Sequence, residues 1–219
     1  MQELVNVTAI VLNSSPIGEY DRRVVLLTKE RGKITAFAKG ARRQTSKLIA
    51  ATNLFAFGEF KLYPGRSAYT LTDAHIKNYF EELRVDFEGA YYGMFFLEVC
   101  DYYTRENNDE KEFLKLVYQS LKALSVKSLN RKLVQCIFVM KAMVINGEFP
   151  GIPAEGNWQE STEYAVSYIM SSSIEKLYTF TVSSEVLAEL RMVMDRWRER
   201  YLDKNMKSLE ILESVKDIC

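Results

Sequence analysis

Cysteine and histidine are scarce in this sequence, and the few that occur are scattered. The three cysteines, Cys100, Cys136 and Cys219, lie far apart, and the single histidine is His75. An odd, dispersed set argues against a disulfide framework, and free cysteines in apolar helical patterns usually pack as small hydrophobic side chains. A lone histidine at the end of a predicted strand is more often structural than catalytic. The sequence therefore predicts neither a disulfide-stabilised fold nor a histidine-centred active site.

Long hydrophobic runs and common catalytic motifs are also absent. The most apolar stretches, 90–100 and 133–145, are interrupted by Glu98, Gln135 and Lys141 before they reach the ~18 residues of a membrane span. No basic segment followed by an apolar core marks a secretory signal, so we expect a cytoplasmic protein. No phosphate-binding loop, GxSxG elbow, HExxH or CxxC spacing occurs. We expect a binding protein and not an enzyme.

The formal net charge is zero, but the charges are unevenly distributed. Residues 1–80 hold 12 basic and 6 acidic side chains, and residues 81–219 hold 17 basic and 23 acidic ones. Such asymmetry indicates that one half faces a polyanion, although oppositely charged segments can also simply attract each other. The length of 219 residues and the hydrophobic content of 47% allow one large domain or two small ones.

The N-terminal part has the pattern of short β-strands. Apolar, β-branched and aromatic residues alternate or are doubled in five segments, 5–12, 22–30, 33–40, 54–63 and 68–76. Gly32 stands where a hairpin requires a positive φ, and Pro64 with Gly65 fits a type II turn. Five short strands in about 80 residues predict a small closed barrel, most commonly the OB-fold, although a small SH3-like barrel fits the same pattern.

After residue 80 the apolar period becomes helical. Segments 84–104 and 128–146 are apolar on nearly all sides, as central helices of a bundle are, whereas 109–125 has one apolar stripe. Residues 147–157 collect five glycine and proline residues and predict an irregular connection. Further helices are predicted at 161–171, 184–203 and 207–216. We therefore predict an α+β protein, with an OB-fold-like barrel at 1–80 and an α-helical bundle domain at 81–219.

A basic cluster follows the third predicted strand and consists of Lys39, Arg42, Arg43 and Lys47. Each phosphate that such a side chain contacts releases condensed counterions, which gives affinity for nucleic acid of any sequence. Gly40 would let the backbone approach a ligand closely. The alternative interpretation of so short a charged segment is a solvated loop.

Aromatic residues near the basic cluster are candidates for stacking on bases, namely Phe37, Tyr63 and Tyr69. Their alternative position is the barrel core, which we favour for Phe37 and leave open for the two tyrosines. Arg22 and Arg23, next to Asp21, either form an inward ion pair that steadies the barrel or line a phosphate-binding rim.

The N-terminal sequence resembles the N-terminal domain of the bacterial RecO family, whose members are DNA repair and recombination mediators. The resemblance lies in AIVLNSSPIGEYDRRVVLLTKERGKITAFAKGARRQTSKL, followed by FGEFKLYPGR and YTLTDAHI. Farther on, LRVDFEGAYYGMFFLEVCD and YLDKNMKSLEIL resemble the family's helical part. The matched motifs add Lys33 and Arg66 to the expected DNA contacts, beside Arg22, Arg23 and the basic cluster.

The resemblance implies a function without catalytic turnover. Family members bind single- and double-stranded DNA, anneal complementary strands, bind the single-strand-binding protein SSB and, with RecR, help RecA to load onto SSB-coated gaps. The resemblance also implies association with the nucleoid during repair. Since SSB tails are acidic and end in an aromatic residue, their pocket needs an apolar lining and one or two cations. Arg131 and Lys132, at the start of an apolar helix, are the candidates, and a solvated helix surface is the alternative.

The chain departs from the family pattern at one place. Many members carry a CxxC…CxxC zinc cluster after the helix that here ends near residue 146, but residues 147–180 contain neither cysteine nor histidine. Because a tetrahedral zinc site needs four such ligands, we predict no zinc there and no other cofactor.

Two other functions fit the same residues. One is a general nucleic-acid-binding barrel, for example for RNA, with a purely structural helical domain. The other is a scaffold whose basic barrel face binds an acidic protein.

Overall fold

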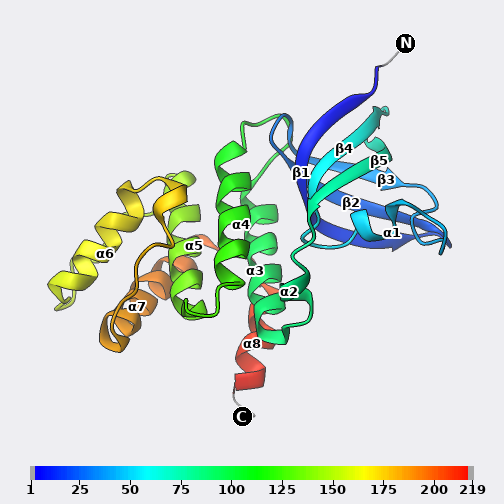
Figure 1. Cartoon of the computed structure of the whole chain (residues 1–219). Helices are drawn as coiled ribbons and strands as arrows, with labels where there is room; N and C mark the ends of the chain where they lie inside the picture. Colours follow the sequence, from blue (N-terminus) through cyan, green and yellow to red (C-terminus); the bar gives the residue numbers. More distant parts are fainter. Residues whose placement is uncertain (1–2, 217–219) are drawn as a thin grey trace. The chain divides into compact units, whose positions relative to one another are not determined.

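The computed structural model describes residues 3–216, which form two compact units (Figure 1). One unit contains the chain up to Glu81 together with Cys100–Leu114, and the other contains Glu82–Val99 and the chain from Lys115 onward. Strands make up most of the first unit and helices make up the second. The predicted α+β class is confirmed. Among the helices between residues 3 and 216, none is long and apolar enough to cross a membrane.

Five strands close into a barrel in the order β1-β2-β3-β5-β4, with β4 pairing back to β1. Neighbouring strands are antiparallel except β3 and β5, which pair in parallel at Ala36↔Tyr69 and Phe37↔Thr70. This closed barrel confirms the OB-fold-like prediction. The strand bounds are Val5–Ile17 (β1), Asp21–Thr28 (β2), Gly32–Ala38 (β3), Phe57–Pro64 (β4) and Tyr69–Asn78 (β5).

Alternation along the strands fills the barrel. In β3, Ile34, Ala36 and Ala38 are at most 2% exposed and lie in the barrel core, whereas the residues between them are half-buried. Because successive side chains of a strand point to opposite faces, the intervening residues lie on the outer face of the barrel. The core is completed by further small and large apolar side chains, among them Val7, Ala9, Val24, Leu26, Phe60, Leu62 and Leu71.

Of the two predicted turns, the hairpin turn at Gly32 is confirmed and the type II turn at Pro64 and Gly65 is not. Gly32 has φ 65°, as the hairpin prediction requires, and a Cβ there would also lie 2.3 Å from the carbonyl oxygen of Arg105. Gly65 does not have a positive φ, so the predicted type II turn is wrong. A Cβ on Gly65 would lie 2.3 Å from the carbonyl oxygen of Ala68, so close backbone approach is what favours glycine there.

Residues 100–114 belong to the barrel's unit because they contact the β2–β3 turn. The backbone N–H of Lys33 donates to the carbonyl of Arg105 (2.9 Å), and that of Asn107 donates to the carbonyl of Arg31 (3.1 Å). The Lys33 ammonium also bonds the Asp101 carboxylate at 3.0 Å. These contacts join segments that lie far apart in the sequence.

The helices of the chain match the predicted ones with local differences. Their bounds are Leu48–Ala51 (α1), Glu81–Arg84 (α2), Phe87–Tyr103 (α3), Lys111–Leu124 (α4), Arg131–Ile145 (α5), Glu160–Ser171 (α6), the 3-10 turn Ile174–Lys176 (η1), Ser184–Tyr201 (α7) and Lys207–Lys216 (α8). The short helices α1 and α2 and the turn η1 were not predicted, and the predicted helix 84–104 begins later, as α3.

Helix α5 is central to the helical unit. Every residue from Leu133 to Met143 is buried, which confirms the prediction from its all-round apolar pattern. Helices α6 and α7 pack against α5 and against each other. Phe96 of α3 stacks on Phe138 of α5 with ring centroids 4.0 Å apart. The predicted irregular connection before α6 is also present, and the Trp197 indole N–H donates to the carbonyl of Gly151 in it (2.8 Å).

Candidate nucleic-acid interface

The basic cluster lies in the connection between β3 and α1, and all four of its cationic side chains are exposed. Ala41, in the middle of the connection, is fully buried in the barrel core and anchors it. Successive turns shape the rest: the N–H of Arg43 donates to the carbonyl of Gly40 (3.0 Å), and that of Ser46 to the carbonyl of Arg43 (2.9 Å). The cluster is therefore presented by an ordered loop.

The end of the β1–β2 hairpin holds this loop through backbone groups. The Asp21 carboxylate accepts the N–H of Gly40 at 2.7 Å, and the carbonyl of Tyr20 accepts the N–H of Arg42 at 2.8 Å. Gly40 has φ 64°, a conformation that glycine adopts without steric cost. Asp21 thus fixes the first turn of the cluster.

Two cationic side chains of the cluster also contact the hairpin end. Arg42 donates through Nη1 to the carbonyls of Glu19 (3.1 Å) and Gly18 (3.3 Å). The Arg43 guanidinium lies 4.9 Å from the centroid of the exposed Tyr20 ring. Both cations are pre-organised at the surface, and an arginine beside an aromatic face resembles the stacking arrangement that nucleic-acid-binding proteins use.

Arg22 binds the residues that follow α1, at the other end of the connection that carries the basic cluster. Its Nη1 donates to the side chain of Asn53 (2.8 Å) and to the hydroxyl and carbonyl oxygens of Thr52 (3.2 and 3.3 Å). The Asp21 carboxylate meanwhile bonds Gly40, so each side chain of the predicted Asp21–Arg22 pair stabilises a separate connection. Arg22 and Arg42 line one hollow of about 360 Å³. Since a guanidinium has five N–H donors, both retain donors for an anion.

An aromatic and cationic row crosses the outer face of the barrel. Arg23 pairs with Phe37, Phe37 with Thr70, and Tyr63 with Thr70 in the strand register. Because directly paired residues lie on the same face of a sheet, these four side chains form one row, called the outer row below. Tyr63 is 46% exposed and Arg23 is exposed.

Phe37 is the residue for which the sequence pattern gave the wrong position. It lies between the fully buried Ala36 and Ala38 and is itself only half-buried, so it is outside the barrel core that we favoured for it. The chain alternates Ala36-Phe37-Ala38, and either face could have been inside. The small alanines are inside because Phe60 and other large side chains already fill the barrel.

Of the remaining predicted residues of the barrel, Arg66 is exposed, whereas Tyr69 and Lys33 contact other side chains of the barrel's unit. Arg66 is exposed in the β4–β5 turn, close in sequence to Tyr63. Tyr69 packs against the barrel core, and its hydroxyl accepts from Arg31 Nη1 at 3.5 Å, so it lies outside the outer row. Lys33 is bound to Asp101 at the opposite end of β3 from the basic cluster. Lys33 and Tyr69 therefore do not belong to the proposed nucleic-acid interface.

In the helical unit, Arg131 is occupied by two carboxylates. Its guanidinium donates to Glu88 at 2.8 Å and to Asp86, and it is only 27% exposed. Burial disfavours its charge, but the hydrogen bonds and the attraction of Glu88 and Asp86 outweigh this and raise the pKa of Arg131. Arg131 joins α5 to the start of α3 and is not positioned to receive an acidic ligand as predicted.

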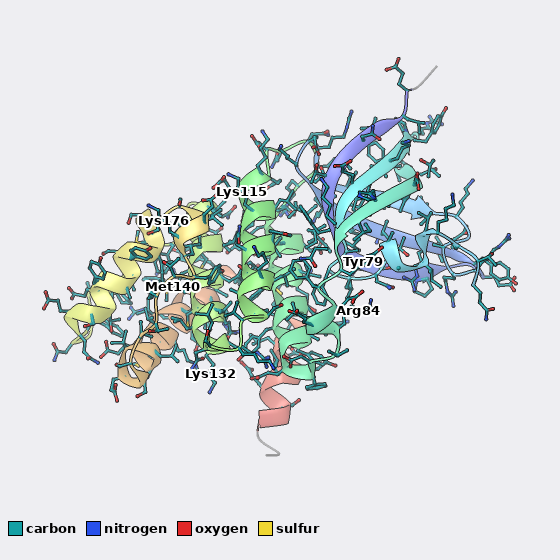
Figure 2. All side chains as sticks on the ribbon, in the orientation of Figure 1. Tyr79, Arg84, Lys115, Lys132, Met140 and Lys176 are labelled. Atoms are coloured by element: carbon teal, nitrogen blue, oxygen red, sulfur yellow. The ribbon has the colours of Figure 1, made fainter. Side chains whose placement is uncertain are left out.

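Lys132, labelled in Figure 2, lies in the first turn of α5. It lines a pocket of about 470 Å³ between the start of α5 and the N-terminal half of α7. The pocket combines apolar side chains, including Leu133 and Leu187, with a second cation, Arg191 of α7. The caps Asn130 and Ser183, which accept N–H groups of their own helices, also line it. Two helix N-termini favour an anion electrostatically. The sequence did not reveal Arg191, since only the packing of α7 on α5 brings it beside Lys132.

Metal-ligand geometry is not found between residues 3 and 216, where no three His, Cys, Asp or Glu side chains gather to hold an ion. His75 is exposed on β5, opposite Glu59 of β4. Cys100 and Cys136 are buried, and Cys219 lies outside the described residues. The expectation that the protein binds no zinc stays a prediction.

Two family models match the chain. The model described as Recombination protein O N terminal matches residues 1–80, and the model described as Recombination protein O C terminal matches residues 84–152. Among curated relatives, each called DNA repair protein RecO, that of Acetivibrio thermocellus is 27% identical over 95% of this chain and 96% of its own. That of Clostridium novyi is 27% identical over 95% and 93%, and that of Alkaliphilus metalliredigens 25% over 97% and 100%.

Proposed function

Because this chain belongs to the RecO family of DNA repair proteins, we propose that it is a recombination mediator without catalytic activity. It binds single- and double-stranded DNA, anneals complementary strands and, with RecR, helps to load RecA onto SSB-coated single-stranded DNA. The observation that carries this proposal is the presence of the outer row and the exposed basic cluster on one small barrel.

The two surfaces of the barrel have complementary roles in holding DNA. Lys39, Arg43 and Lys47 neutralise phosphates, and each such contact releases counterions regardless of base sequence. Phe37 and Tyr63 of the outer row offer rings to unpaired bases, and stacking contributes about 1–3 kcal/mol per base by alanine substitution. Arg23 lies beside Phe37 in the register and adds a cation to the stacking surface. Duplex DNA uses only the phosphate contacts, so we expect it to bind more weakly than single strands.

Annealing follows from the same contacts without any reactive group. Two complementary strands repel each other as polyanions, and a cationic surface that holds both lowers this repulsion. Weak stacking keeps bases unpaired and accessible for short times, after which base pairing supplies the free energy. This account requires no nucleotide, metal ion or covalent intermediate.

The pocket that contains Lys132 and Arg191 is the proposed site of the acidic SSB tail. Its two cations and two helix N-termini attract carboxylates, and Leu133 and Leu187 can cover the terminal aromatic ring. Arg191 takes the place that we expected Arg131 to hold. Binding of the tail brings the protein to SSB-coated strands, where the barrel acts on the DNA.

Strand annealing of complementary oligonucleotides, naked or coated with SSB, tests the proposal. We expect the wild-type protein to accelerate both reactions. A variant with Lys39, Arg43 and Lys47 replaced by alanine should lose both, whereas a Lys132→Glu, Arg191→Glu variant should still anneal naked strands but fail on coated ones. Failure of the wild-type protein to accelerate annealing of naked strands would contradict the proposal, and tighter binding of RNA than of single-stranded DNA of equal length would favour the RNA-binding alternative.

A further inference from the structure

A groove of the helical unit is lined by aromatic residues that have no role in the proposed binding of DNA or of the acidic tail. It has a volume of about 760 Å³ and lies between α6, residues 179–183 and the start of α7. Tyr164 and Tyr168 of α6 and Phe180 form its aromatic wall, and we call it the aromatic groove. Tyr164 is 72% exposed, which is unusual for so large a ring on a well-packed helix.

The aromatic wall is a connected, ordered surface. The rings of Tyr168 and Phe180 meet edge to face at 5.3 Å, and those of Tyr164 and Tyr168 lie 6.5 Å apart. The Tyr168 hydroxyl donates to the carbonyl of Lys176 (3.2 Å), at the end of η1. This bond fixes the ring against the chain that leads into the groove.

The other wall is a length of backbone without partners. Residues 180–182 belong to no helix or strand and run as a stretched connection from η1 to α7 (Figure 1). Within residues 3–216, their backbone N–H and carbonyl groups form no hydrogen bond. Free donors and acceptors on such a segment are the template to which an extended peptide adds as a new strand.

The charge of the groove selects the peptide. Glu160 is the only charged residue in its lining, and Glu163 is exposed on the same turn of α6. A third carboxylate, that of Glu189, is not available, since it accepts bonds from Gln159 and Thr162. Exposed carboxylates beside aromatic faces attract Lys and Arg side chains through charge and cation–π contacts, and they repel DNA and acidic tails.

We propose that the aromatic groove binds an extended segment of a partner protein in which Lys or Arg alternates with apolar residues. The segment pairs with the backbone of residues 180–182. Because alternate side chains of a strand point to the same face, its basic residues lie against Tyr164 and Glu160 while its apolar residues lie on the other side. Thr181, Val182 and Ser183 also line the pocket of Lys132 and Arg191, so the two sites share one wall, but the aromatic residues and Glu160 belong to the groove alone and the inference does not rest on the function of that pocket.

A fluorescein-labelled, capped hexapeptide of alternating Lys and Val is the probe, and an alternating Glu–Val hexapeptide is its control. Fluorescence anisotropy with the full chain should detect micromolar to sub-millimolar binding of the Lys–Val peptide only. Tyr164→Ala should weaken binding by about two- to fivefold, as loss of an exposed cation–π contact implies. Glu160→Lys should weaken it at least as much. Amide signals of residues 180–182 should shift in NMR spectra on titration.

Two matched variants control for general effects. Phe87→Ala removes another exposed aromatic side chain of the same unit, and Glu82→Lys reverses another exposed carboxylate of that unit, both outside the groove. Neither should change peptide affinity. The inference is overturned if the Lys–Val peptide does not bind, if the Glu–Val peptide binds equally, or if Tyr164→Ala and Phe87→Ala have the same effect. It is likewise overturned if binding leaves the amides of residues 180–182 unshifted.

Discussion

Lys33 lies in β3 and Lys39 directly follows that strand, but the two lysines differ in whether a carboxylate binds them. The Lys33 ammonium is held by the Asp101 carboxylate at 3.0 Å and is only 22% exposed. Lys39 is exposed, and within residues 3–216 it has neither an ion-pair nor a hydrogen-bond partner. A cation already paired with a carboxylate gains little from a phosphate, whereas a free one releases counterions on binding.

Substituting these two lysines separately should therefore give different results. Lys39→Ala should lower the slope of log affinity for single-stranded DNA against log salt concentration by about 0.7, the contribution of one phosphate contact. Lys33→Ala should leave the slope unchanged and slightly lower the midpoint of urea unfolding. Anisotropy titrations at several salt concentrations measure the slope. Equal slopes for the two variants would show that the contact with Asp101 does not decide which lysine binds DNA.

The two described cysteines should be chemically inert in the folded protein. Burial raises the pKa of the Cys136 thiol to about 12, and it raises the pKa of Cys100 as well. At pH 8 both therefore remain thiols, and the thiolate is the reactive form. A Cys219→Ser variant should show no reaction with Ellman's reagent until urea unfolds it, after which two thiols should react. Rapid reaction of the folded variant at pH 8 would contradict the burial of these side chains.

At the level of elements, Lys141 links two helices of the bundle. It is 7% exposed on α5, and its ammonium donates to the carbonyls of Ile169, Met170 and Ser172 at the end of α6, at 2.8–3.1 Å. The last carbonyls of a helix have no partner within the helix, so Lys141 supplies a donor to buried and partly buried carbonyls that need one. The sequence showed only a charge that interrupted an apolar run.

Replacing Lys141 by methionine should destabilise the protein although it makes α5 more apolar. The carbonyls at the end of α6 would lose their donor, and we expect the free energy of unfolding to fall by roughly 2–4 kcal/mol. Urea unfolding followed by circular dichroism measures it. Lys127→Met, at an exposed position, is the matched control and should change little. If Lys141→Met is as stable as this control, the ammonium does not stabilise the α6 end.

How far the sequence predicts an element depends on whether its pattern is local. The stripe of α4 and the all-round apolar pattern of α5 are local, and both helices form as predicted. Contacts between segments far apart in the sequence decide which partner each cationic side chain has. Asp86 and Glu88 occupy Arg131, Asp101 occupies Lys33, and the packing of α7 on α5 brings Arg191 beside Lys132. No periodicity within α5 or β3 contains this information, so the positions of single cations could not be predicted.

For the whole molecule, the separation of charge along the chain corresponds to different proposed ligands. The basic first 80 residues contain the barrel that is proposed to bind DNA. The acidic remainder contains the pocket of Lys132 and Arg191, proposed to bind an acidic tail, and the aromatic groove, proposed to bind a basic peptide. We expect net repulsion from the acidic remainder to favour DNA binding on the barrel. DNA binding by the barrel and tail binding by the helical unit should therefore be separable by substitution.

Reversing the charge of the tail pocket should affect only the tail. With Lys132→Glu and Arg191→Glu, affinity for an acidic peptide that ends in an aromatic residue should fall at least about tenfold, because like charges meet in a partly desolvated pocket. Affinity for naked single-stranded DNA should not change. Both are measured by anisotropy at one fixed salt concentration. If barrel substitutions abolish peptide binding instead, the tail binds on the DNA surface and competes with it.

Salt-dependent binding of single-stranded DNA is the most direct test that the basic cluster is the DNA-binding surface. In the variant with Lys39, Arg43 and Lys47 replaced by alanine, the slope of log affinity against log salt concentration should fall by about two, and affinity at moderate salt should fall more than tenfold. A control with Lys29, Lys77 and Lys127 replaced by alanine loses the same charge at other exposed positions and should keep most of the wild-type slope. Equal losses of slope in the two variants, with both folds intact, would contradict the assignment of DNA binding to this cluster.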